Sequence, residues 1–182
     1  MIKNSSKGYG WLTILIHWIF ALAVFGLFGL GVYMVELSYY DPWYHDAPEI
    51  HKSIGMILIF LIAFRLIWRW FNPRPEALSS LSSMEKHASE WAHRGLYLII
   101  VVTLLVGYVI PTAEGRAVSV FGWFEVPALF PTIDGMADIA GEIHEWMAWT
   151  LVILAVVHGL AALKHHFIDK DKTLVRMLRP EK

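Results

Sequence analysis

The 182-residue sequence contains no cysteine. This absence excludes disulfides, thiolate-bound metals, cysteine-ligated iron–sulfur clusters and thioether attachment of a prosthetic group. Any metal chemistry must therefore use nitrogen or oxygen ligands, and nine histidines are available for it.

Charged residues are also scarce. They make up 17% of the chain, whereas hydrophobic residues make up 57%; an ordinary globular domain is roughly one quarter charged. The apolar residues form four long runs at about 11–35, 51–70, 91–110 and 143–163, each long enough to cross a bilayer as a helix. We therefore expect an all-α integral membrane four-helix bundle in contact with the lipid bilayer, with no nucleic-acid partner.

The segments between the runs contain helix-breaking residues and no repeat or low-complexity linker. Prolines at 73 and 75 end the second run and Pro111 ends the third. No small-residue cleavage site follows the first run, so it is expected to be a span and not a signal peptide. We expect one transmembrane domain over residues 1–182, a short surface helix within 76–90, and an irregular loop at about 112–140.

Basic residues beside the membrane ends predict the orientation. One side of the predicted topology holds 13 of them: Lys3, Lys7, Arg65, Arg69, Arg74, Lys86, Arg94, Lys164, Lys170, Lys172, Arg176, Arg179 and Lys182. The other side holds only Lys52 and Arg116. Because basic residues are enriched on the cytoplasmic side, both termini are expected in the cytoplasm.

Four histidines lie inside the predicted spans, at positions 17, 51, 144 and 158. Polar residues in a bilayer are costly and usually face the bundle interior, where they bind a ligand, relay protons or hydrogen-bond a neighbouring helix. His144 and His158 are 14 residues apart, so at about 100° per residue they point the same way, roughly 21 Å apart along the helix. One lies near each side of the hydrocarbon core.

The alternating topology places His51 level with His144 on the outer side, and His17 level with His158 on the cytoplasmic side. Two imidazoles on opposite faces of a flat macrocycle are the axial ligands of low-spin haem iron, and helix bundles build such sites from facing helices. Four unrelated hydrogen-bonding histidines would have no reason to pair by depth. We therefore expect two haem b groups, one for each pair.

Other polar residues near the cytoplasmic ends have two interpretations each. Arg65 and Arg69 lie on nearly the same face as His51 and could pair with the propionates of the inner haem, or snorkel to the interface. His93 could contact a quinone or a propionate, or be an ordinary interface histidine. The basic patch of Lys164, His165 and His166 is either part of a quinone site or a positive flank.

The whole pattern resembles the bacterial cytochrome b561 family, which is related to the cytochrome b subunits of nickel–iron hydrogenases. The similar segments are IHW at 16–18, HKSIG at 51–55, FRLIWRWFNPRPE at 64–76, the histidines of the fourth span, and HHFIDKDKTLVRMLRP at 165–180. The resemblance implies a di-haem membrane bundle of the bacterial inner membrane with ligands at His17, His51, His144 and His158. It also implies electron exchange with ubiquinone on the cytoplasmic side and a periplasmic electron donor, which is superoxide or a redox protein.

The charge of the outer side bears on that donor. It carries ten acids against two bases: Glu36, Asp41, Asp46, Glu49, Glu114, Glu125, Asp134, Asp138, Glu142 and Glu145. A negative field slows the approach of an anion such as superoxide and favours a basic or neutral donor.

Two other functions fit the composition. A haem-bearing anchor subunit of a larger respiratory oxidoreductase, such as a hydrogenase, would copurify with a soluble partner. A histidine-dependent transporter would show broken helices and paired intramembrane carboxylates, which these spans lack.

Overall fold

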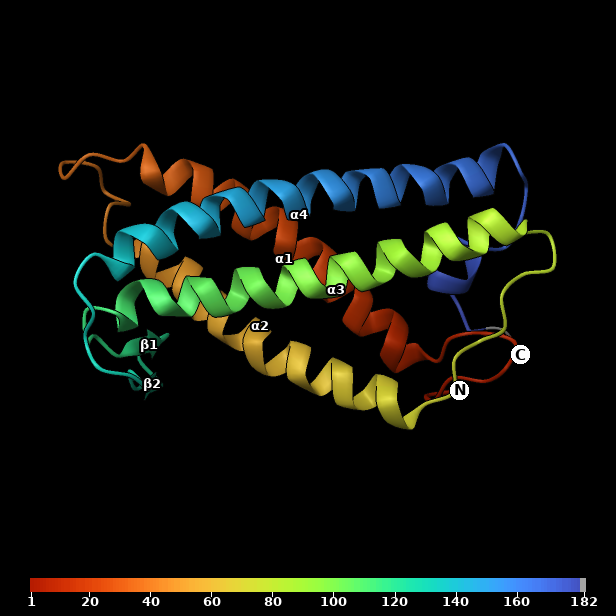
Figure 1. The fold of residues 1–182 in the computed structure, drawn as a ribbon, viewed down its shortest axis with the longest axis horizontal. Helices are drawn as coiled ribbons and strands as arrows, with labels where there is room; N and C mark the ends of the chain where they lie inside the picture. The colour runs from red at the N-terminus through yellow and green to blue at the C-terminus, as the bar shows by residue number, and fades with distance from the viewer. Residues whose placement is uncertain (181–182) are drawn as a thin grey trace. The chain divides into compact units, whose positions relative to one another are not determined.

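The computed structural model describes residues 1–180. In chain order its long helices are α1 (Trp11–Val35), α2 (Asp46–Phe71), α3 (Ser83–Thr112) and α4 (Met136–Phe167), as Figure 1 shows. All four are long and apolar enough to cross a membrane. The predicted all-α membrane bundle of four helices is therefore confirmed.

The chain divides into two compact units, and every long helix contributes one part to each. The first unit contains residues 1–21, 63–97 and 153 onward, and the second contains residues 22–62 and 98–152. His17 and His158 belong to the first unit, whereas His51 and His144 belong to the second. Each predicted histidine pair can therefore be described within one unit.

The helices α2, α3 and α4 begin before the predicted spans because polar turns precede their apolar stretches. The prediction of a separate surface helix within 76–90 is wrong, since residues 83–90 are the first turns of α3. Its start is a capping box: the Ser82 hydroxyl and backbone N–H both donate to Glu85 Oε2, at 2.8 and 3.0 Å, and the Glu85 N–H donates to Ser82 Oγ.

The outer loop is more regular than predicted, since it contains an antiparallel hairpin of β1 (Val118–Val120) and β2 (Phe124–Val126). Its turn includes Phe121 at φ 52°, a left-handed conformation that is unfavourable for a bulky residue unless surrounding contacts stabilise it. Ser53 on α2 supplies such a contact, because its buried Oγ accepts the Phe121 N–H at 2.9 Å. Val118 and Val120 pack against Met56 of α2.

The C-terminal segment folds back within the first unit. After α4 it forms a short 3-10 helix, η1 (Val175–Met177). The Trp18 indole N–H donates to the Met177 carbonyl at 2.6 Å, and the Arg176 guanidinium donates to the Glu76 carbonyl at 2.8 Å. These bonds attach the tail to α1 and to the segment between α2 and α3.

Candidate functional site: two histidine pairs

The inner pair consists of His17 on α1 and His158 on α4. Their ring centroids lie 6.3 Å apart with the ring planes at 65°. The outer pair consists of His51 on α2 and His144 on α4, with centroids 6.1 Å apart and planes at 77°. All four side chains are half-buried. The structure thus brings together each of the two pairs that depth alone predicted.

These separations fit an iron between the rings. A metal–imidazole bond is about 2 Å and the nitrogen lies roughly 1 Å from the ring centre, so an iron between two such rings separates the centroids by about 6 Å. Both pairs match this distance. Their neutral nitrogen donors also suit haem iron, so the residues present fit two haem b groups.

The outer pair has partners that orient its rings. His144 Nδ1 lies 2.9 Å from the Thr103 carbonyl, which can only accept, so Nδ1 carries the proton and Nε2 is left free to bind a metal. Glycines make room for both rings. A Cβ at Gly107 would lie 2.8 Å from His144 Cε1, and one at Gly31 would lie 3.4 Å from His51 Cε1. The site therefore depends on small residues at these two positions.

His93, a predicted quinone or propionate contact, lies against the inner pair. Its ring centroid is 5.2 Å from that of His158. This distance is shorter than the roughly 6 Å that a shared iron would need, so His17 is the better partner for His158. His93 Nδ1 lies 3.4 Å from the Ser89 hydroxyl one turn earlier on α3.

Arg65 also lies beside the inner pair. One guanidinium nitrogen lies 3.4 Å from His17 Nδ1, and Nε donates to the Tyr97 hydroxyl at 2.8 Å. The guanidinium also lies over the rings of Phe20 and Tyr97, each at 5.4 Å. The Arg69 guanidinium also lies over the Tyr97 ring, 5.1 Å from its centroid. Both predicted arginines therefore gather around Tyr97.

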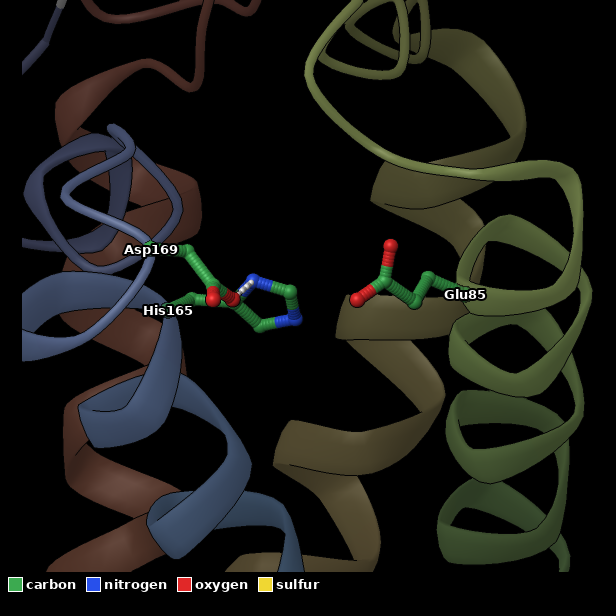
Figure 2. Close-up of side chains that lie close together, drawn as sticks. All are labelled: Glu85, His165 and Asp169. Carbon is green, nitrogen blue, oxygen red and sulfur yellow. Dashed lines mark ion pairs between the residues drawn. The ribbon is translucent and has the colours of Figure 1, made fainter.

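Two of the predicted quinone-site residues belong to a second polar cluster in the same unit. Figure 2 shows His165, in the last turn of α4, and Asp169, just beyond the end of that helix, facing Glu85 of α3. His165 Nδ1 lies 2.9 Å from Asp169 and 3.1 Å from Asp171. The Lys164 ammonium lies 2.7 Å from Asp169 and 3.3 Å from Glu85. A cation is already supplied here, so the cluster is an ion-pair network that joins α3 to α4.

Asp171 is the buried member of this network, with 6% of its side chain exposed. Burial alone would raise its pKa, but hydrogen bonds from Thr173 and the adjacent His165 outweigh burial and lower the pKa below its usual value. The carboxylate therefore stays ionised at neutral pH. The remaining predicted residue, His166, packs its ring against Phe167 at 4.8 Å.

Several contacts of the pairs escaped the sequence prediction, namely Gly31, Tyr97, Thr103 and Gly107. Their spacing carried no signal, because the spans are apolar on nearly all sides and the rotation of each helix about its axis could not be assigned. A tyrosine and a threonine in the third span were the available hints, since polar groups in a bilayer usually have a partner.

Comparisons with known proteins identify the family of the chain. The family model of prokaryotic cytochrome b561 matches residues 8–180. "Cytochrome b561 homolog 2" of Escherichia coli (strain K12) is 50% identical over 175 residues, which are 96% of this chain and 93% of that protein. "Probable superoxide oxidase CybB" of Yersinia pestis is 29% identical over 177 residues, 94% of this chain and 96% of that protein.

The family match and the four spans together indicate a multi-pass protein of the bacterial inner membrane. The family implies haem b as its cofactor. This chain belongs to the prokaryotic cytochrome b561 family and is a membrane electron carrier.

Proposed function

We propose that the chain carries electrons across the membrane from a periplasmic donor to ubiquinone near the cytoplasmic side, with both termini in the cytoplasm. It would act as a quinone-linked oxidoreductase formed by a single domain. The observation that carries the proposal is the presence of two histidine pairs, each with ring centroids about 6 Å apart as iron ligation requires.

Each pair has a defined role in this proposal. His17 and His158 would hold the inner haem b, and His51 and His144 the outer one. Each haem supplies a one-electron Fe(III)/Fe(II) couple when bound. The Thr103 carbonyl fixes the tautomer of His144, and Gly31 and Gly107 leave room for the rings of His51 and His144. Arg65 and Arg69 would supply positive charge for the propionates of the inner haem.

For the quinone we favour the surroundings of His93. It is half-buried and in contact with His158, so a quinone there would lie beside the inner pair. Lys164 and His165 would contribute only through the ion-pair network, because their side chains are engaged with Glu85, Asp169 and Asp171.

Haem stoichiometry tests the core of the proposal. The purified protein should give two haem b per chain in a pyridine haemochrome assay and a low-spin spectrum. His158→Ala should remove one component and His144→Ala the other, whereas His87→Ala, at an exposed position, should change neither. One haem per chain, or loss of both components in each variant, contradicts the two-site assignment.

Quinone reactivity tests the direction of transfer. The reduced protein alone in liposomes should be reoxidised by a water-soluble ubiquinone analogue, and His93→Gln should slow this step while leaving the haem content unchanged. A protein that reacts with quinone only when a soluble partner copurifies would instead be an anchor subunit.

A further inference from the structure

The inner and outer pairs differ in the charge that surrounds them. Beside the inner pair, the Arg65 guanidinium lies 3.4 Å from His17 Nδ1. The outer pair has a neutral carbonyl, that of Thr103, at the corresponding nitrogen of His144. Lys52, which follows His51 in the sequence, forms an ion pair with Glu49, and α2 begins with the acidic residues Asp46 and Glu49.

The charge beside the inner pair is fixed in position. Arginine keeps its proton at any physiological pH. Its Nε–H donates to the Tyr97 hydroxyl at 2.8 Å, and the aromatic rings of Phe20 and Tyr97 both contact the guanidinium. If a metal bound His17 at Nε2, the ring proton would be on Nδ1. Nδ1 could then no longer accept a hydrogen bond from the Arg65 guanidinium. Because Tyr97 holds Arg65 separately, the charge would remain beside the ring.

Such a charge should control the redox chemistry of the inner pair. Reduction of a bis-imidazole iron removes one positive charge, so a nearby cation favours the reduced form, most strongly where water is excluded. A carbonyl that accepts from Nδ1–H acts in the opposite direction, because it makes the imidazole a stronger donor and favours the oxidised form.

We propose that Arg65, positioned by Tyr97, raises the reduction potential of the inner pair above that of the outer pair and so directs electrons inward. Arg65 and Tyr97 are positioning residues in this proposal, which rests on the proposed function because it requires a haem at each pair. It predicts an equilibrium preference for electrons at the cytoplasmic end before any quinone is present.

Redox titration of the purified holoprotein, followed by absorption, tests the proposal. The component removed by His158→Ala should be the higher-potential one. Arg65→Gln should lower its midpoint alone, with roughly a tenfold or larger change in the ratio of oxidised to reduced haem at a fixed ambient potential. Arg65→Lys should keep part of the effect, and Tyr97→Phe should give a smaller shift because the charge is retained but less well held.

Arg94→Gln is the matched control, since Arg94 is an arginine of α3 with 60% of its side chain exposed and an ion pair to Glu90. It should move neither midpoint. The proposal is overturned if the inner component is not the higher one, or if Arg65→Gln and Tyr97→Phe move neither midpoint or both equally. A purely structural role would reduce haem content without this selective shift. A wild-type protein with one haem would instead refute the proposed function itself.

Discussion

At the scale of single residues, Gly107 is where the smallest change should have a selective effect. In Gly107→Ala the new Cβ would lie 2.8 Å from Cε1 and 3.0 Å from Nδ1 of His144. The ring must move, and its bond to the Thr103 carbonyl should break. We expect loss of the outer haem component and destabilisation by about 1–3 kcal/mol from overpacking, measured by haem content and thermal unfolding.

Gly95→Ala is the control for this substitution, because Gly95 is also on α3 and a Cβ there would meet nothing within 4 Å. It should keep both haem components and unfold at the same temperature or slightly above, since alanine is the better helix former. Equal haem content in the two variants would show that His144 does not need the space at Gly107.

The histidines were predictable from the sequence, whereas their partners were not. His144 and His158 lie on one helix at a known spacing, and topology alone matches each in depth to a histidine on another span. The contacts of Tyr97 and Thr103 cannot be predicted from their depth in the membrane, because they depend on how each helix is rotated about its axis. Arg65 was expected either to pair with a propionate or to snorkel to the interface, and its contact with His17, 48 residues earlier in the chain, was not predicted.

At the scale of secondary-structure elements, the start of α3 has an identifiable anchor. Ser82→Ala removes the hydroxyl that accepts the Glu85 N–H and donates to its carboxylate. Loss of such a cap costs about 0.5–2 kcal/mol. It should also loosen Glu85, which pairs with Lys164 of α4. We expect a lower unfolding temperature in detergent with both haems retained.

Ser80→Ala provides the comparison, because Ser80 is exposed in the turn that precedes α3. It should leave the unfolding temperature unchanged. A similar decrease in both variants would mean that the segment is sensitive to any loss of a hydroxyl, and that the capping box is not the cause.

Hydropathy predicted the existence of all four helices and the bounds of α1. It underestimated the lengths of α2, α3 and α4, because a helix begins at its polar cap and not at its first apolar turn. The hairpin β1–β2 was missed for a different reason. Its strands have three residues each, and its turn depends on Ser53, a tertiary contact from a segment 68 residues away.

At the scale of the whole molecule, the natural absence of cysteine makes the orientation directly testable. Single cysteines at Asp134 and at Lys7 should differ in their access to a membrane-impermeant maleimide. We expect Asp134→Cys to react in intact spheroplasts, and Lys7→Cys to react only after the membrane is permeabilised, because the basic side is predicted to face the cytoplasm. The opposite labelling pattern would invert the predicted topology, and the cysteine-free parent reports background labelling.

The acidity of the predicted outer side determines how the proposed donor reaction should respond to salt. Ten acids against two bases repel an anion, and salt screens this repulsion, since the Debye length is about 10 Å at 0.1 M. The rate of haem reduction by superoxide should therefore rise with ionic strength. The rate with a basic redox protein should fall. A superoxide rate that falls with salt would indicate a local basic entry site that overrides the surrounding acids.

The helix α4 supplies one histidine to each pair, His144 and His158, while the partners come from α1 and α2. During synthesis the first two spans leave the ribosome long before α4 does. Under the proposed ligation neither iron can gain its second imidazole until the last span has entered the membrane. Cofactor loading is therefore a late step of biogenesis, and a chain truncated before α4 should accumulate without bis-histidine haem at either position.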